Sequence, residues 1–169
     1  MGIFKNDDQK SSQFGFDEKS MAGKAVKAEN GKIYVSVVFS DGDNVQFDQN
    51  ALYAIWTEDT DRGAFPVGTT LCAGMQELNP FLLEWYYKHM SPNDELMAGP
   101  SGYQFIYGRD YSEEGYEKWL ELNRRWLASA GFKTACFWHT SYGTDRFYRY
   151  AETCLLYTSP SPRDMRRSR

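Results

Sequence analysis

Short apolar runs and amphipathic segments alternate along this chain, and that alternation limits the folds it can adopt. The apolar or β-branched runs occupy residues 32–39, 65–73, 94–98 and 132–138. Helical patterns occupy residues 45–59, 77–90 and 112–131. Strands that alternate with helices form parallel sheets, because each helix carries the chain back to the start of the next strand. We therefore predict an α/β fold with a parallel sheet.

The number of strands leaves two architectures open. A closed (β/α) barrel takes about eight strands, and this chain offers four. The sheet is therefore either a small open one or a partial barrel, made of about four β/α units of a larger barrel. The second alternative is the one we adopt as the prediction. The run at 32–39, which is almost continuously apolar, predicts a strand buried on both faces.

Two of the helices carry clear end signals. Asn79 is a suitable cap for the helix at 77–90, and Pro80 suits its first position. Ser112 can cap the helix at 112–131, and Gly131 can end it. Three tryptophans lie at helical spacing and are expected to pack against the sheet: Trp85, Trp119 and Trp126.

Charge and cysteine content exclude several classes of protein. The formal net charge is −4, and it is −7 without residues 154–169 (15 Lys and Arg against 22 Asp and Glu). That acidic remainder has no basic clusters, which argues against a nucleic acid or an anionic membrane as partner. No stretch has the length and apolarity of a membrane span, and residues 1–12 lack the apolar core of a signal peptide. Cys72 and Cys136 lie in apolar runs without metal-ligand spacing, so we expect small buried hydrophobic residues.

The two ends of the chain differ from its middle. Residues 1–31 are polar and irregular, as in a linker or the end of a preceding domain. Residues 32–153 form the predicted domain. Residues 154–169 begin "CLLYTSPSPRD" and resemble the translated read-through of a sequencing-library adapter, so we interpret them as a non-native tail. The alternative is a natural, disordered basic tail.

Polar side chains follow each of the predicted strands. Ligands of parallel α/β proteins bind at the carboxyl ends of the strands, so these side chains are expected to meet at one edge of the sheet. Carboxylates for acid/base work, together with aromatic rings that stack on sugars, are typical of a carbohydrate site. The candidates are Asp41, Asp43 and Asn44, then Glu77, then Ser101, Gly102, Tyr103 and Tyr107, and finally His139.

Each candidate also has a structural interpretation. Asp41 and Asp43 flank a glycine and could form a tight turn that caps the next helix, act as acid and base, or bind a divalent cation. Glu77 could be a charge at a helix start, and His139 a hydrogen-bonded structural residue. The loop tyrosines could simply pack within their own loop.

Four segments together resemble the C-terminal domain of the GxGYxYP family of putative glycoside hydrolases. They are "VSVVFSDGDNVQ", "FPVGTTL", "NPFLLEWYYKHMSPNDELMAGPSG" and "WLASAGFKTACFW". The naming motif falls on "GYQFIYG", where Gly102 and Tyr107 match while Gln104, Phe105 and Gly108 differ. The resemblance implies a divergent, truncated member with a barrel-like domain, part of a larger secreted bacterial protein that processes carbohydrate.

The sequence supports three functional hypotheses. The first is a glycoside hydrolase that uses Asp41 or Asp43 with Glu77, Asp110 or a carboxylate outside the chain, without a cofactor. The second is a metal-dependent polysaccharide deacetylase. The third is a carbohydrate-binding domain without catalysis. All three take a carbohydrate as partner, and none specifies an oligomeric state.

Overall fold

The protein is a mixed α/β structure, as the alternation predicts. The computed structural model describes residues 29–137 and 143–154. Three parallel strands form one sheet in the order β1-β2-β3. The elements, in chain order, are β1 (Val38–Phe39), α1 (Val45–Gln49), α2 (Ala51–Glu58), β2 (Val67–Leu71), α3 (Met75–Leu78), α4 (Pro80–Lys88), β3 (Asp94–Ala98), a 3-10 turn η2 (Gly108–Asp110), α5 (Glu113–Ala130) and α6 (Thr144–Cys154).

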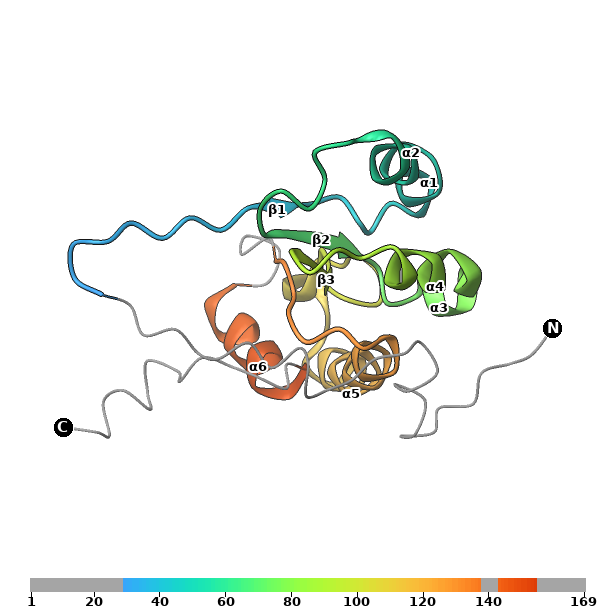
Figure 1. The fold of residues 1–169 in the computed structure, drawn as a ribbon. Helices are drawn as coiled ribbons and strands as arrows, with labels where there is room; N and C mark the ends of the chain where they lie inside the picture. Colours follow the sequence, from blue (N-terminus) through green and yellow to red (C-terminus); the bar gives the residue numbers. More distant parts are fainter. Residues whose placement is uncertain (1–28, 138–142, 155–169) are drawn as a thin grey trace.

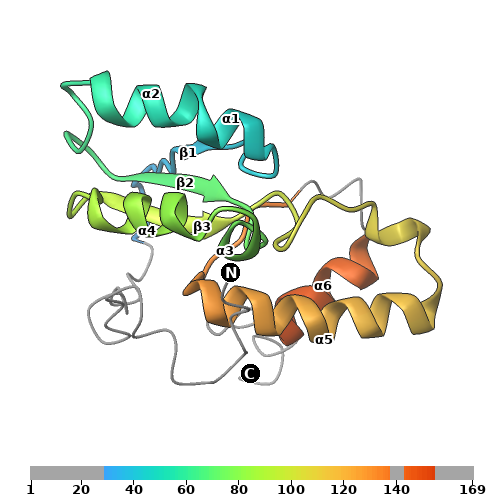
Figure 2. The same cartoon turned by 90° about the vertical axis from the view of Figure 1, so that its right-hand side faces the viewer.

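Strand β2 is the centre of the sheet. It pairs with β1 from Val38 opposite Gly68, and with β3 as far as Leu71 opposite Ala98. The sheet lies between the α1–α2 pair and the α5–α6 pair (Figures 1 and 2). Because all three strands are parallel, their carboxyl ends lie at one edge, which we call the carboxyl edge.

A strand is expected at 132–138, and over its described part, residues 132–137, there is a single parallel bridge between Ala98 and Ala135. Two backbone hydrogen bonds make it, from Ala98 N–H to Thr134 O at 2.9 Å and from Cys136 N–H to Ala98 O at 2.7 Å. The pairing is limited on both sides. Phe132 still donates to the end of α5, and Ala98 is the last residue of β3.

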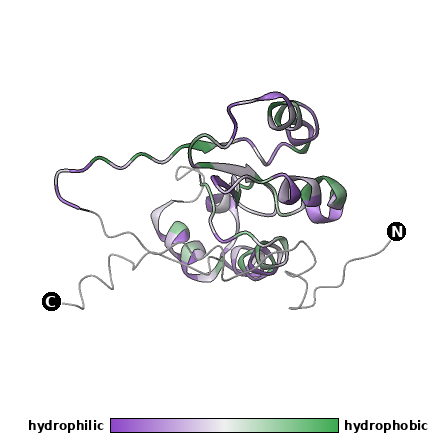
Figure 3. Ribbon diagram, viewed as in Figure 1, coloured by the Kyte–Doolittle hydropathy of each residue, from purple (hydrophilic) through white to green (hydrophobic). Residues whose placement is uncertain are grey.

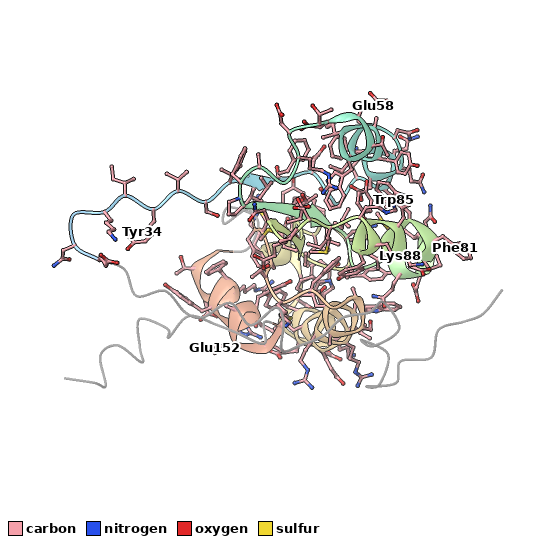
Figure 4. The ribbon with its side chains drawn as sticks, viewed as in Figure 1. Tyr34, Glu58, Phe81, Trp85, Lys88 and Glu152 are labelled. Carbon is pink, nitrogen blue, oxygen red and sulfur yellow. The ribbon has the colours of Figure 1, made fainter. Side chains whose placement is uncertain are left out.

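The prediction that residues 32–39 form a strand buried on both faces is wrong. Only Val38 and Phe39 belong to β1, and residues 31–40 are all exposed, with Ile33 at 92%. In the part of the chain that the structure describes, β1 is an edge strand with no neighbour on its outer side. The apolar segment before it therefore runs away from the sheet and carries Tyr34 with it (Figures 3 and 4).

The predicted helix ends are confirmed. Asn79 Oδ1 accepts a hydrogen bond from Leu82 N–H at 3.2 Å and caps α4, which begins at Pro80. Ser112 Oγ accepts from Gly115 N–H at 3.1 Å and caps α5. Gly131 ends α5 with a φ of 80°, a left-handed conformation that suits glycine.

The core fills the space between the sheet and its helices. Trp85, Trp119 and Trp126 pack against it, as predicted, but are only partly buried. Trp85 lies between α4 and α2, with its ring 4.5 Å from that of Tyr53 (Figure 4). The largest fully buried side chains are Tyr86, Tyr116, Tyr150, Phe132, Leu52, Leu71, Met75, Leu83, Leu96, Leu120 and Leu127.

The sequence analysis did not predict α6. This helix packs along α5, and its Tyr150 is fully buried, while its last residue, Cys154, is 4% exposed. Cys72 is buried as expected, whereas Cys136 is only partly so.

The turn between β1 and α1 approaches the backbone of β2 very closely. Gly42 N–H donates to Thr70 Oγ1 at 3.0 Å, and the Thr70 hydroxyl donates to Phe39 O at 3.1 Å. A Cβ atom on residue 42 would lie 1.9 Å from the carbonyl oxygen of Thr70. A side chain at this position therefore cannot be accommodated without moving the turn or the central strand.

We expect Gly42→Ala to destabilise the protein by about 3 kcal/mol, the upper part of the range for overpacked positions. Gly115→Ala is the control, because a Cβ atom there would meet only side-chain atoms, the nearest being Ser112 Oγ at 3.0 Å, and no backbone atom, so we expect a much smaller loss of stability. Urea unfolding followed by circular dichroism measures both variants. Equal stability of the two variants would contradict the close approach.

Candidate functional site

The residues that follow β1, β2 and β3 meet at the carboxyl edge. Residues 40–44 follow β1, residues 72–74 follow β2, and a long loop, 99–107, follows β3. Backbone hydrogen bonds join the second group to the third, from Ala73 N–H to Gly102 O at 2.8 Å and from Gly74 N–H to Tyr103 O at 3.0 Å. The candidates that follow these three strands therefore lie along one edge of the sheet.

Asp41 and Asp43 lie on the turn that Gly42 anchors. Asp41 is exposed and has a φ of 86°, a left-handed conformation that is uncommon for residues other than glycine. Asp43 is half-buried. Burial, and to a smaller extent the nearby charge of Asp41, raise the pKa of the Asp43 carboxyl above its usual value. The half-buried Asp43 is thus the stronger candidate for proton transfer.

Asn44 is the N-cap residue of α1. Its Oδ1 accepts a hydrogen bond from Phe47 N–H at 3.1 Å and caps the start of α1. Its own N–H donates to Asp41 O at 3.1 Å. The predicted turn that caps the next helix is therefore present, and it orients the two aspartates.

Asp48, which the sequence analysis missed, lies behind this turn. It is completely buried, and neither of its carboxylate oxygens has a hydrogen-bond partner among the described residues. Burial, followed by the charges of Asp43 and Asp41, raises the pKa of Asp48 to about 8. A signal existed: Asp48 shares a helical face with Val45 and Leu52, which both belong to the core or pack against it.

Two further side chains border the Asp48 carboxyl. Tyr86 of α4 donates its hydroxyl to the backbone oxygen of Asp48 at 2.6 Å. Cys72 is buried at the end of β2, and burial together with the charges of Asp48 and Asp43 raises the pKa of its thiol to about 12. At neutral pH these neighbours carry no positive charge that could stabilise an ionised Asp48.

Glu77 and Tyr103 form a pair further along the carboxyl edge. The Tyr103 hydroxyl donates to Glu77 Oε2 at 2.8 Å, and its ring lies 5.0 Å from that of Trp126. Burial and this hydrogen bond raise the pKa of Tyr103 to about 12. Glu77 itself is exposed at the start of α3. The pair therefore presents an exposed carboxylate beside a fixed aromatic ring.

Ser101 and Gly102 lie inside the structure. Both are buried and have positive φ angles, 78° and 119°. The buried Asn123 of α5 donates to Ser101 O at 3.3 Å and accepts from Tyr103 N–H at 2.8 Å. Tyr150 of α6 also donates to Ser101 O, at 2.9 Å. Ser101 and Gly102 therefore determine the course of the loop that presents Tyr103.

Tyr107 and His139 complete the predicted set. Tyr107 is 49% exposed, its ring lies 4.9 Å from that of Phe105, and the guanidinium of Arg109 lies 5.8 Å from it. His139 lies outside the described residues. The other candidates thus form two groups, an acidic one at the β1–α1 turn and an aromatic one on the loop after β3, to which Glu77 of α3 is joined through Tyr103.

Two absences hold for residues 29–137 and 143–154. No three His, Cys, Asp or Glu side chains there are grouped so that they could hold a metal ion. No helix in the same ranges is long and apolar enough to cross a membrane.

The burial of Asp48 makes stability depend on pH. The pKa is about 8 in the folded protein against an ordinary 3.8, so between these values the folded chain keeps a proton that the unfolded chain has released. The contribution of Asp48 to stability is therefore most favourable below about pH 4 and becomes less favourable as pH rises towards 8, by up to about 1.4 kcal/mol per pH unit.

Asp48→Asn should remove this dependence, because the amide stays neutral. We compare the free energy of unfolding of Asp48→Asn with that of the wild type. We expect the difference, in favour of the variant, to be larger at pH 7.5 than at pH 5. Urea unfolding at the two pH values measures it. The matched control is Asp61→Asn, at an exposed residue in the turn before β2, which should retain the wild-type dependence. A difference between wild type and Asp48→Asn that stays constant from pH 5 to pH 7.5 would contradict the assignment.

Comparisons with known proteins agree with this arrangement. Among solved structures, the chain is similar to one described as a putative hydrolase from Bacteroides thetaiotaomicron VPI-5482, with a TM-score of 0.61 and 29% sequence identity. The match covers 66% of this chain and 22% of that chain, so this sequence spans a small part of that protein's length. A search of curated proteins found no match.

The family comparison covers more of the sequence. A sequence model of the GxGYxYP putative glycoside hydrolase C-terminal domain matches residues 31–161. The matched range includes the β1–α1 turn, the loop after β3 and every helix and strand described above. The resemblance predicted from the four motifs is therefore confirmed, and the chain belongs to the GxGYxYP putative glycoside hydrolase family, through its C-terminal domain.

Proposed function

We propose that this protein hydrolyses glycosidic bonds at the carboxyl edge of its parallel sheet. Membership of the family and the likeness to a structure described as a putative hydrolase support a hydrolase-like function. The observation that carries the proposal is the position of Asp43. It is half-buried at the end of β1, where burial raises its pKa, as is usual for carboxyls that transfer protons.

Glycosidases use two carboxyl groups that flank the bond they cleave. In this proposal Asp43 is one of them, and Asp41 is its exposed neighbour on the same turn. Glu77, which Tyr103 holds at 2.8 Å, is the first choice for the second. Asp110 in η2, or a carboxylate elsewhere in a longer protein, is the alternative. The half-buried ring of Tyr103 and the exposed ring of Tyr107 are suited to stack against sugar faces in such a site.

The same proposal includes a larger barrel. The exposed apolar segment at 33–39 and the open edge of β1 are features that a neighbouring strand would cover. The similar solved structure is also much longer than this chain. We propose that the sheet is part of a (β/α) barrel in a secreted bacterial protein. The location rests on the family resemblance alone.

A second candidate function is carbohydrate binding without catalysis. It is favoured by the aromatic residues gathered on the loop after β3, where Phe105 and Tyr107 pack at 4.9 Å and Tyr103 lies against Trp126. Such a domain would bind a glycan through these rings and would not depend on Asp43.

We expect Asp43→Asn to lower turnover at least 100-fold, the usual loss when a general acid or base is removed. The measurement is the release of new reducing ends from a panel of soluble polysaccharides. Asp61→Asn is the control, because Asp61 lies in the turn before β2, at the opposite end of the strand, and should keep wild-type activity. Thermal unfolding of both variants checks that they fold.

Two results would count against the hydrolase. Activity of Asp43→Asn within twofold of the wild type would remove Asp43 from the mechanism. Saturable glycan binding without new reducing ends, lost in Tyr107→Ala but kept in Asp43→Asn, would favour the binding domain.

A further inference from the structure

Asp48 is the least explained polar side chain of the molecule. Among the described residues, it is the only buried side chain whose polar atoms lack a hydrogen-bond partner. Neither of its two carboxylate oxygens has one. Its exposed fraction is zero. Native proteins contain few such groups, and each calls for a physical reason.

An ionised carboxylate is unstable in this position. Removing a charge from water without a partner costs several kcal/mol, and the usual response of the group is to become neutral. None of the ion pairs among the described residues includes Asp48. The side chains that interact with it electrostatically are Asp41 and Asp43 from the turn, Cys72 from the end of β2 and Tyr86 from α4. Each of these is either acidic or uncharged at neutral pH.

We propose that Asp48 is a positioning residue that holds a proton behind Asp43, so that at neutral pH the negative charge of the pair lies on Asp43. The less buried Asp43 gives up its proton first, because solvent stabilises its ionised form better. Asp43 then meets a substrate as a carboxylate, the form of a base or nucleophile. This assignment rests on the proposed function. It specifies that Asp43 acts there as a base or nucleophile.

The proposal has a consequence for pH dependence. When Asp48 ionises in alkaline solution, its proton leaves to solvent, and a second negative charge lies behind Asp43. Interacting carboxyls of this kind titrate as a pair, so a change in one moves the midpoint of the other. A residue with only a packing role would not move that midpoint.

The test is a titration of side-chain carboxyl carbons by NMR in the ¹³C-labelled chain. The Asp48 signal is assigned by its loss in Asp48→Asn, and the Asp43 signal by its loss in Asp43→Asn. We expect Asp48 to titrate above neutral pH in the wild type. Its midpoint should fall by about one pH unit in Asp43→Asn, because the repelling charge is removed. Asp61→Asn should leave it unchanged. If Asp43→Asn does not fold, Asp41→Asn provides the same comparison with a smaller shift.

Three results would overturn the proposal. They are an Asp48 midpoint in the ordinary range of exposed aspartates, a midpoint that stays the same in both aspartate variants, and a midpoint that falls below neutral pH when Ca²⁺ or Mg²⁺ is added. The last would show that the cluster binds a cation in place of the proton.

This measurement needs no substrate, so it separates the two proposals. A coupled pair in a chain that cleaves no polysaccharide would leave the proton-holding role intact and reject the hydrolase. Where hydrolysis is found, Asp48→Asn should shift the alkaline limb of the activity profile, because no second negative charge then forms behind Asp43. Cleavage with an alkaline limb unchanged in Asp48→Asn would reject the role of Asp48 alone.

Discussion

The acidic turn can lie against the sheet because residue 42 has no side chain. The backbone of Gly42 approaches Thr70 so closely that a Cβ atom would be 1.9 Å from the threonine carbonyl oxygen. The Thr70 hydroxyl then joins the turn to the edge strand, accepting from Gly42 N–H and donating to Phe39 O. The position of Asp43, the start of α1 and the burial of Asp48 all follow from this one contact between the turn and the central strand.

The turn also explains how two acidic groups so close in sequence obtain different environments. Asn44 caps α1 and directs this short helix back over the end of the sheet. Asp43 remains half-buried at the edge, whereas Asp48, one turn further along, lies in the core beside Cys72 and Tyr86. Environments that separate the proton affinities of neighbouring carboxyls are the usual means by which active sites assign different roles to them.

The aromatic side of the edge is organised by a different contact. The buried Asn123 of α5 binds the loop after β3 at Ser101 and Tyr103, and Tyr150 of α6 adds a second bond to Ser101. Two helices that contribute no candidate catalytic group therefore fix the ring of Tyr103 beside Glu77. The carboxyl edge thus carries an acidic group and an aromatic group, held by separate parts of the fold.

Short-range patterns in the sequence were enough to predict the α/β class, the strands β2 and β3, the caps of α4 and α5 and the family. These depend on local periodicity, on capping side chains and on motifs within short stretches. Three features depend on packing between distant elements: the exposure of residues 32–39, the single bridge at Ala135 in the described part of the fourth strand, and the burial of Asp48 without a hydrogen-bond partner. Each of these depends on which distant elements pack against the segment. The type of a residue, apolar or acidic, does not show whether a distant element will cover it.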